Sequence, residues 1–308
     1  MALTHSTVVT GTNDGAKQVS LTAWNADHAI DTDGLDLPEG ATPAAPAAGH
    51  TKIFAKNIGG RIMPAFMGPS GLDSTLQPHV ARNRWSLWSP IVASATISAI
   101  GSAALTAVGT ATASPAWAST NVHTRGNRLD YLVTTAATSA IAGYREATAR
   151  WRGTDGYHHI FRVSPATGGT VATRRFFCGM AASVAAQTDV QPSSQLSIVG
   201  VGYDAADTTW QVMFNDGTGT ATKVNTAITR PSTDRPGIYS VMIFVPPGGA
   251  SASVTITDEG AGTTYSTSST TDLIVATTAV AARAYHSVGG TSSIVGLSLF
   301  GGYIESDN

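Results

Sequence analysis

The sequence predicts an all-β protein whose C-terminal part is an antiparallel β-sandwich, preceded by an extended N-terminal arm and a short stalk. After Trp85, apolar residues recur at every second position in several runs, which is the period of a β-strand. Glycine, proline, asparagine or aspartate separates these runs, and no long stretch has a helical period of 3.6 residues. We therefore divide the chain into an arm (1–40), a Pro/Gly-rich stalk or trimerisation segment (41–84) and a sandwich (85–308).

The arm and the stalk differ from the C-terminal part of the chain in composition and in sequence pattern. The arm is polar except for VSLTAWNADHAI, where Trp24 and His28 would share one face of a single helical turn. The segment PEGATPAAPAAGH has prolines among alanines and favours an extended spacer. TKIFAK predicts one short strand, and the glycines and prolines after it predict turns. This front part has too little apolar area to fold as an isolated monomer.

Two runs in the C-terminal part give the clearest strands. In GIYSVMIFVPPGG both alternating sets are largely apolar, which predicts an inner strand of the sandwich. In ASVTITDEG the residues Ala252, Val254 and Ile256 alternate with serine and threonine, so one face of that strand is expected to meet water.

Composition excludes several classes of partner. Only 12% of the 308 residues are charged and the formal net charge is -2, so no basic field exists to hold nucleic acid. The single cysteine, Cys178, excludes an intrachain disulfide and a thiolate zinc site, and we expect it to fill a strand. No secretory signal is recognisable at the start of the sequence, so the product is expected to stay where it is made. The uncharged stretch between Arg84 and Arg125 is rich in Ser, Thr and Gly, which predicts short strands and no membrane insertion.

The stretch VGYDAADTTWQVMFNDGTGTATKV places three aspartates near Trp210, which raises the question of a catalytic pair beside a sugar-stacking ring. Alternation around Trp210 followed by Asp216 and Gly217 predicts a hairpin, in which Asp216 is a turn residue. Asp204 and Asp207 are expected to fix the preceding loop by bonding their own downstream amides. We therefore favour a structural role in turns and loops for these three aspartates over a catalytic role.

A glycosidase is the strongest enzymatic alternative, because two suitably spaced carboxylates would suffice. Of the four glutamates, Glu39 and Glu305 are assigned to the stalk and to the terminal tail, which leaves Glu146 and Glu259 as pocket candidates. The turn FNDGTGTATKV does not meet the spacing of a calcium loop.

The sequence contains no motif for any other catalytic or metal-binding chemistry. His158 and His159 are neighbours on a predicted strand and would point to opposite faces, so they cannot close on one metal ion. Nucleophile, zincin and nucleotide motifs do not occur in the sequence. We expect no cofactor, no metal and no catalytic residue.

Arginines cluster around Glu146 in GYREATARWRG. We interpret Arg145, Arg150 and Arg152 as charges on a solvated strand edge, which discourage edge-to-edge pairing. The alternative is a patch for an anionic sugar, with Trp151 as its stacking surface.

Two parts of the sequence resemble bacteriophage tail-fibre and head-fibre (spike) proteins. VSLTAWNADHAI and TPAAPAAGHTKIFAKNIGGRIMPAFMGPSGLDSTLQP are similar to a W-N-x-x-H knot and a proline-containing unit that occur near the N-termini of such proteins. GYHHIFRVSPATGGTVATRRFFCGMAAS and IVGVGYDAADTTWQVMFNDGTGTATKV resemble a lectin-like, jelly-roll head. The resemblance implies attachment to other virion structural proteins through Trp24, Asn25 and His28. It also implies a homotrimer that buries Trp24, Ile53, Phe54 and Phe66 between chains.

The resulting hypothesis is a non-enzymatic virion fibre or spike, assembled in the host cytoplasm, that presents the sandwich for recognition of a host-surface glycan. Exposed aromatic residues in shallow loop sites would bind the glycan, with Trp151, Tyr157 and Tyr203 as candidates. A glycan-depolymerising hydrolase on the virion and a capsid decoration protein without a receptor remain the alternatives.

Overall fold

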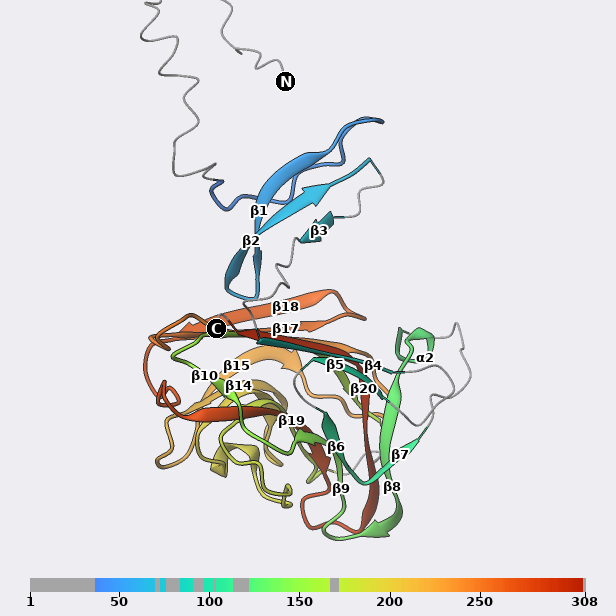
Figure 1. The fold of residues 1–308 in the computed structure, drawn as a ribbon. Helices are drawn as coiled ribbons and strands as arrows, with labels where there is room; N and C mark the ends of the chain where they lie inside the picture. Colours follow the sequence, from blue (N-terminus) through green and yellow to red (C-terminus); the bar gives the residue numbers. More distant parts are fainter. Residues whose placement is uncertain are drawn as a thin grey trace, which may run out of the picture.

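The protein folds into two large β-sheets that pack face to face, with a small three-stranded sheet standing over one of them (Figure 1). The computed structural model describes residues 37–69, 73–75, 84–90, 97–101, 104–112, 122–166 and 172–306. The predicted attachment residues Trp24, Asn25 and His28 lie outside the described residues. All pairings between named strands are antiparallel, so the predicted all-β antiparallel sandwich is confirmed.

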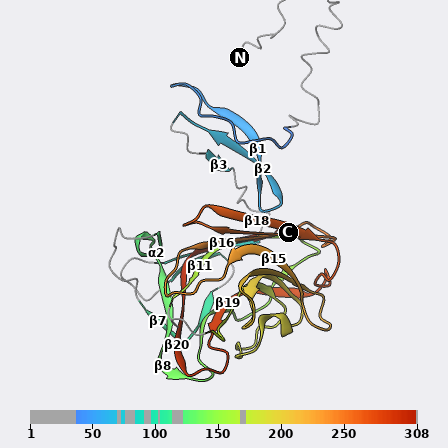
Figure 2. The same ribbon diagram turned by 180° about the vertical axis from the view of Figure 1, so that it is seen from behind.

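The nine-stranded sheet forms the layer nearest the small sheet (Figures 1 and 2). Its main path, in spatial order, is β18 (Thr263–Ser269), β17 (Ala252–Asp258), β16 (Tyr239–Val245), β11 (Tyr157–Pro165), β20 (Ser293–Ser306), β4 (Arg84–Pro90) and β5 (Ile97–Gly101). Two further strands extend it from β20, namely β8 (Leu129–Ala137) and β7 (Thr110–Thr112). A single helical turn, α2 (Val122–Arg125), precedes β8.

The eight-stranded sheet forms the other layer. Its path is β15 (Thr222–Thr229), β14 (Thr209–Asn215), β13 (Ile198–Tyr203), β12 (Arg175–Ala181), β19 (Ala279–Ser287), β9 (Ile141–Glu146) and β6 (Leu105–Val108). The short β10 (Trp151–Arg152) pairs with β19, and the 3-10 turn η1 (Pro192–Ser194) lies in the connection between β12 and β13. The described part of the uncharged stretch contains the short strands β4, β5, β6 and β7, as predicted, and most of α2. Among the residues that the structure describes, no helix has the length and apolar content that crossing a bilayer requires.

The main hydrophobic core lies between the two large sheets. Aromatic rings from opposite sheets meet there: the centroids of Trp210 and Tyr239 are 4.7 Å apart, and Tyr144 stacks on Phe161 at 5.4 Å. Cys178 is a free, fully buried thiol in this core, as its predicted packing role requires. Alternation therefore sends one set of side chains of each strand into a dry interior, and that burial is the main source of stability.

Strand β16 shows how the outer face of the nine-stranded sheet is partly covered. Tyr239, Val241 and Ile243 are buried in the core, while Met242 and Phe244 on the opposite face are half-buried. The strand lies between β17 and β11, so the prediction of an inner strand is confirmed. The covering element is the hairpin of β1 (Lys52–Ile58) and β2 (Arg61–Met67), to which β3 (Asp73–Thr75) adds a third strand.

The tip of this hairpin rests on the sandwich of the same chain (Figures 1 and 2). Gly59 and Gly60 have left-handed backbones, with φ of +61° and +100°, and a side chain on either would collide with Met242 or Ser253. Next to them, Arg61 forms an ion pair with Glu305, whose side chain is only 1% exposed. Assigning Glu305 to a terminal tail was wrong, because Glu305 belongs to β20 and pairs in register with His158 of β11.

Titratable groups are buried in and against the core. Four of the described histidines are buried, namely His123, His158, His159 and His286. Burial lowers the pKa of His158 to about 4 and the pKa values of the other three to about 3. Burial raises the pKa of Glu146 to about 7, although its carboxylate accepts hydrogen bonds from Ala282 and Trp151 that act in the opposite direction.

We expect the protein to lose stability as the pH falls from 7 to 5. Each buried histidine binds a proton in the unfolded chain below pH 6.5 but not in the folded chain, which costs about 1.4 kcal/mol per histidine and pH unit. Glu146 acts in the opposite sense, because its raised pKa gives stability that is present at low pH and lost as the pH rises towards 7. Because four histidines act in one direction and one glutamate in the other, the net effect is a smaller free energy of unfolding at low pH. Calorimetry should show a lower melting temperature at pH 5, and less pH dependence after His158→Gln with His159→Phe. A melting temperature that is constant or rises towards pH 5 would contradict this.

Candidate functional site

A groove of about 690 Å³ lies between the hairpin tip and the outer face of the nine-stranded sheet, and we call it the hairpin groove. Residues 56–60 of the hairpin and Met242 of β16 line it. The remaining lining residues all bear hydroxyls: Ser253, Thr255, Thr257, Thr264, Ser266, Thr267 and Ser268. The groove is thus a polar cleft formed by segments far apart in the sequence.

The hydroxyl floor follows from the register of β17 and β18. Serine and threonine alternate with the core residues of β17, and the facing residues of β18 are also serine and threonine. The Oγ atoms of Thr255 and Ser266 are 2.8 Å apart, and those of Thr257 and Thr264 are 2.9 Å apart. Because strands are about 4.8 Å apart and side chains on one face repeat every two residues, the hydroxyls form a regular two-row array. Thr255 is 5% exposed, so the predicted water-facing side of β17 is partly covered.

The hairpin wall adds an amide and a cationic side chain to the groove. Asn57 Oδ1 accepts a hydrogen bond from the Gly60 amide at 2.8 Å, which fixes the tip, while its Nδ2 donates to Glu39 at 3.4 Å. Among the described residues that line the groove, Lys56 is the only ionisable side chain. The described lining of the groove therefore offers neutral donors and acceptors and one cationic donor, and it contains no pair of carboxylates of the kind that glycoside hydrolysis uses.

The predicted glycan-binding aromatics are not exposed. Trp151 and Tyr203 are fully buried and Tyr157 is 4% exposed, so the expectation of exposed rings in shallow loop sites was wrong. Each ring belongs to the inward set of its strand: Trp151 donates to Glu146 Oε2 at 2.8 Å, and Tyr203 packs against Trp210. None of them offers a sugar a free stacking face.

The aspartates near Trp210 hold loops. Lys223 Nζ lies 3.1 Å from Asp204 and 2.7 Å from Asp207, and Asp204 Oδ1 accepts from the Ser193 amide at 3.1 Å. Their predicted loop-fixing role is confirmed, but the direction differs: Asp207 Oδ2 accepts from the amide of Asp204, which lies upstream. Trp210 is fully buried, so its ring is not a stacking surface beside these carboxylates.

Asp216 is a turn residue, as predicted. Its Oδ1 accepts from the amide and the hydroxyl of Thr218, both at 2.8 Å, and Gly217 has a φ of +112°. Six residues, 216–221, connect β14 to β15, so the turn is longer than the predicted tight hairpin. Asp272 of a distant loop helps to hold it by accepting from the Asp216 amide at 3.0 Å.

The glutamates considered as pocket candidates lie apart from each other and from the groove lining. Glu146 is completely buried on the core side of β9. Glu259 accepts from Arg162 at 2.7 and 2.5 Å and from Ser240 at 2.5 Å. Both carboxylates are thus engaged in structural contacts, and the two do not form a catalytic pair.

Of the three arginines in the cluster, Arg152 does lie on a strand edge as interpreted: it is exposed, and its strand β10 pairs with β19 alone. Arg145 does not. Strand β9 lies between β19 and β6, so the interpretation of Arg145 as an edge charge was wrong. Arg145 instead donates to the carbonyl of Val184 at 2.5 Å, and Arg150 Nε lies 3.9 Å from Glu146. The alternative of a sugar patch stacked on Trp151 also fails, because that ring is buried.

His158 and His159 point to opposite faces, as predicted. His158 contacts Phe244 on the outer face, with ring centroids 6.0 Å apart, and His159 contacts Phe161 in the core at 4.3 Å. Within the described ranges, no group of three or more His, Cys, Asp or Glu side chains could hold a metal ion.

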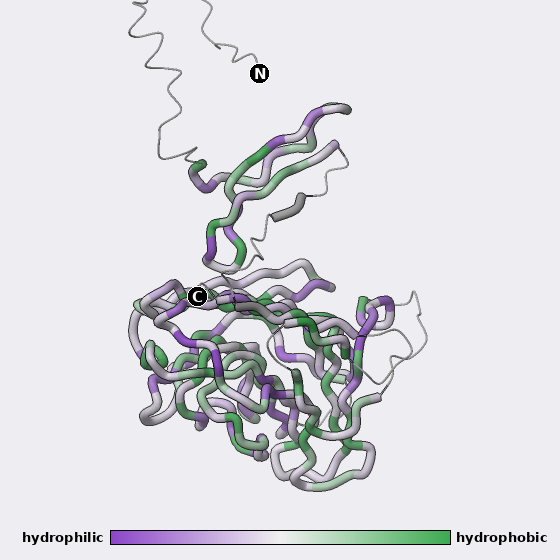
Figure 3. The backbone as a smooth tube through the Cα atoms, viewed as in Figure 1, coloured by the Kyte–Doolittle hydropathy of each residue, from purple (hydrophilic) through white to green (hydrophobic). Residues whose placement is uncertain are grey.

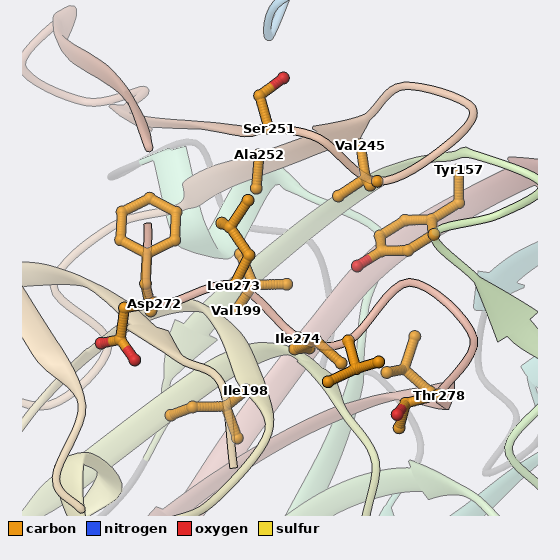
Figure 4. A pocket seen from close by; sticks show the side chains of 15 residues that line it. Tyr157, Ile198, Val199, Val245, Ser251, Ala252, Asp272, Leu273, Ile274 and Thr278 are labelled. Atoms are coloured by element: carbon orange, nitrogen blue, oxygen red, sulfur yellow. The ribbon is translucent and has the colours of Figure 1, made fainter. Parts of the chain in front are cut away.

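A second hollow lies between the two large sheets at one end of the sandwich (Figure 4). The side chains of Tyr157, Val199, Val245, Leu273 and Ile274 surround it, and most of its lining is apolar. Its volume of about 20 Å³ is the space of about one water molecule. It is a packing gap, too small for a sugar ring.

Sequence reasoning missed the groove residues. The signal was present in TTYSTSS, whose polar alternation matches that of the preceding ASVTITD across a short turn. Pairing those two runs as a hairpin would have predicted the hydroxyl array, but nothing local indicates that the distant hairpin of β1 and β2 stands over it.

Comparison with solved structures finds similar β-sandwich proteins. Peanut lectin is 12% identical over 73% of this chain and 98% of its own, with a TM-score of 0.47. Arcelin-5, a lectin-like defence protein from Phaseolus vulgaris, is 9% identical over 73% of this chain and 99% of its own, also with a TM-score of 0.47. A protein of unknown function from Shewanella oneidensis MR-1 is 10% identical over 75% and 90%, with a TM-score of 0.48. No family model and no curated protein matches the chain.

Proposed function

We propose that the protein is a non-enzymatic fibre or spike subunit whose sandwich binds a glycan in the hairpin groove. The observation that carries the proposal is the floor of paired hydroxyls on β17 and β18, enclosed on one side by the hairpin tip. A serine or threonine hydroxyl both donates and accepts, so a regular array of them suits a ligand that is itself covered with hydroxyls.

The groove also has the mixed character that sugars require. The half-buried Met242 gives an apolar patch beside the hydroxyls, against which the C–H face of a sugar ring can pack. The near absence of ionisable groups in the lining favours a neutral saccharide. A shallow neutral site of this kind binds weakly by itself, and several copies on one particle would raise the avidity without new contacts.

A virion role rests on the front of the chain. The resemblance of residues 19–30 and 42–78 to phage fibre segments supports attachment to other virion structural proteins through Trp24, Asn25 and His28. In this proposal the protein is located in the virion and is assembled in the host cytoplasm. The low charge and the disulfide-free sandwich suit a particle that persists outside cells.

A homotrimer is the proposed assembly, and the hairpin supplies a surface for it. Ile53, Ile62 and Phe66 are 64%, 47% and 36% exposed and lie on the same face of the hairpin, with Ile53 and Phe66 as register partners. Figure 3 shows hydrophobic residues along this hairpin as well as in the sandwich. Phe54 points to the opposite face and is half-buried, so we omit it from the proposed trimer contact.

Removing a hydroxyl pair should weaken glycan binding. We expect Thr255→Val with Ser266→Ala to lower the affinity for a neutral oligosaccharide about thirtyfold, because two hydrogen bonds of about 1 kcal/mol each are lost. Titration calorimetry of the full chain against a panel of neutral oligosaccharides measures this. Thr229→Val, which removes an exposed hydroxyl of β15, is the matched control and should have no effect.

Three outcomes would overturn the glycan proposal. Equal affinity in the double variant and the control would remove the groove from the binding site. Release of reducing ends from host surface polysaccharide would favour the hydrolase. Failure of every oligosaccharide, together with unchanged host adsorption of particles that lack residues 85–308, would favour a decoration protein without a receptor.

Charges on the apolar hairpin face should dissociate the trimer. We expect sedimentation of the full chain to give three copies, and Ile53→Asp with Phe66→Asp to give one copy, because the charged variant would have to bury unpaired carboxylates. Leu196→Asp, at an exposed leucine of the sandwich, should leave the trimer intact. A wild-type chain that sediments as a monomer at micromolar concentration would contradict the proposed assembly.

A further inference from the structure

The outer face of the eight-stranded sheet has its own cover, on the side of the sandwich opposite the hairpin groove. The connection 182–197, which contains η1, runs across this face. Beneath it lies a second buried cluster that includes Phe177, Ile198, Met213 and Tyr285. Gln195 Nε2 donates to the Tyr285 hydroxyl at 2.6 Å, which ties the connection to the sheet.

Two arginines hold the start of this connection. Arg145 of β9 and Arg283 of β19 are register partners, so their side chains leave the sheet side by side. Arg145 donates to the carbonyl of Val184 at 2.5 Å, and Arg283 donates to the carbonyls of Ser183 at 2.9 Å and Ala185 at 3.2 Å. The two guanidinium groups thus share three consecutive carbonyls.

The arginine pair has no carboxylate partner among the described residues. The carbonyls supply partial charges but no anion, whereas nearby Arg175 forms an ion pair with Asp189 at 3.1 Å. Arg283 is 4% exposed, and burial together with the neighbouring Arg145 lowers its pKa. Two like charges at directly opposite positions repel each other, and a buried charge without a counter-charge is costly. The site is electrostatically incomplete.

A hollow of about 320 Å³ opens beside Arg283, lined also by Ser183, Gln187, Thr188 and Gln195. Two of its lining residues have buried polar atoms that lack a hydrogen-bond partner within the described residues, namely Arg283 Nε and Gln187 Oε1. Gln187 is 8% exposed, and its Nε2 donates to the Tyr144 carbonyl at 3.2 Å. One orphaned group is a cationic donor and the other is a neutral acceptor.

We infer that this hollow binds a small hydroxylated carboxylate of the uronic acid class. The carboxylate would accept from Arg283 Nε and neutralise the arginine pair, and a hydroxyl of the same ligand would donate to Gln187 Oε1. The site lies on the opposite outer face from the hairpin groove and has a different charge. It is therefore independent of the proposed binding of a neutral glycan.

Titration of the full chain with glucuronate, glucose and sulfate at constant ionic strength tests the inference. Glucuronate should bind saturably, glucose should not bind in the hollow, and sulfate, which has no hydroxyl for Gln187, should bind at least tenfold more weakly than glucuronate. Arg283→Gln should lower the affinity for glucuronate at least tenfold.

A second pair of variants tests the inference even if Arg283→Gln disturbs the structure of the connection 182–197. Ala186 is exposed and lines the hollow, so Ala186→Glu would place a tethered carboxylate beside the arginines, while Ala186→Gln has nearly the same shape without the charge. We expect Ala186→Glu to reduce glucuronate affinity at least tenfold with no loss of melting temperature, and Ala186→Gln to keep at least a third of the wild-type affinity. The absence of saturable glucuronate binding, equal affinity in the Glu and Gln variants, or sulfate binding as tight as that of glucuronate would overturn the inference.

Discussion

The ion pair between Arg61 and Glu305 is the contact on which the arrangement of the molecule depends. Glu305 is almost completely buried on the outer face of the nine-stranded sheet, where the hydroxyl of Tyr303 also donates to it at 2.7 Å. A buried carboxylate that loses its cation costs several kcal/mol, so this pair resists separation even though it adds less net stability than apolar packing would. It fixes the hairpin tip, and the hairpin tip is the wall of the groove.

The sandwich presents two differently covered outer faces from one core. The core forms because apolar residues alternate along the strands and point inward, and its aromatic rings fill the space between the sheets. One outer face carries hydroxyls and the hairpin, whereas the other carries the connection 182–197 and two arginines that have no carboxylate partner among the described residues. The proposed neutral-glycan site and the proposed carboxylate site, on opposite faces, would allow one sandwich to bind two chemically different ligands.

The sequence was sufficient for the fold but not for the site. Period-two patterns located β14, β16 and β17, and turn chemistry assigned Asp216 correctly. The same period cannot tell which of two alternating sets faces inward, so Trp151, Tyr157 and Tyr203 were expected at the surface although they lie in the core. The hairpin groove and the arginine pair both depend on contacts between residues far apart in the chain, and no local pattern encodes such contacts.

Hydrogen exchange in Arg61→Met tests most directly whether this ion pair holds the hairpin on the sandwich. The substitution keeps an apolar stem and removes the charge, and the matched control is Arg162→Met, which breaks the more exposed pair with Glu259 on the same face. We predict that amides of residues 52–67 exchange at least tenfold faster in Arg61→Met, while those of β12 and β13 and the whole control variant remain like the wild type. Unchanged exchange in the hairpin of Arg61→Met, or equal acceleration in both variants, would contradict the account.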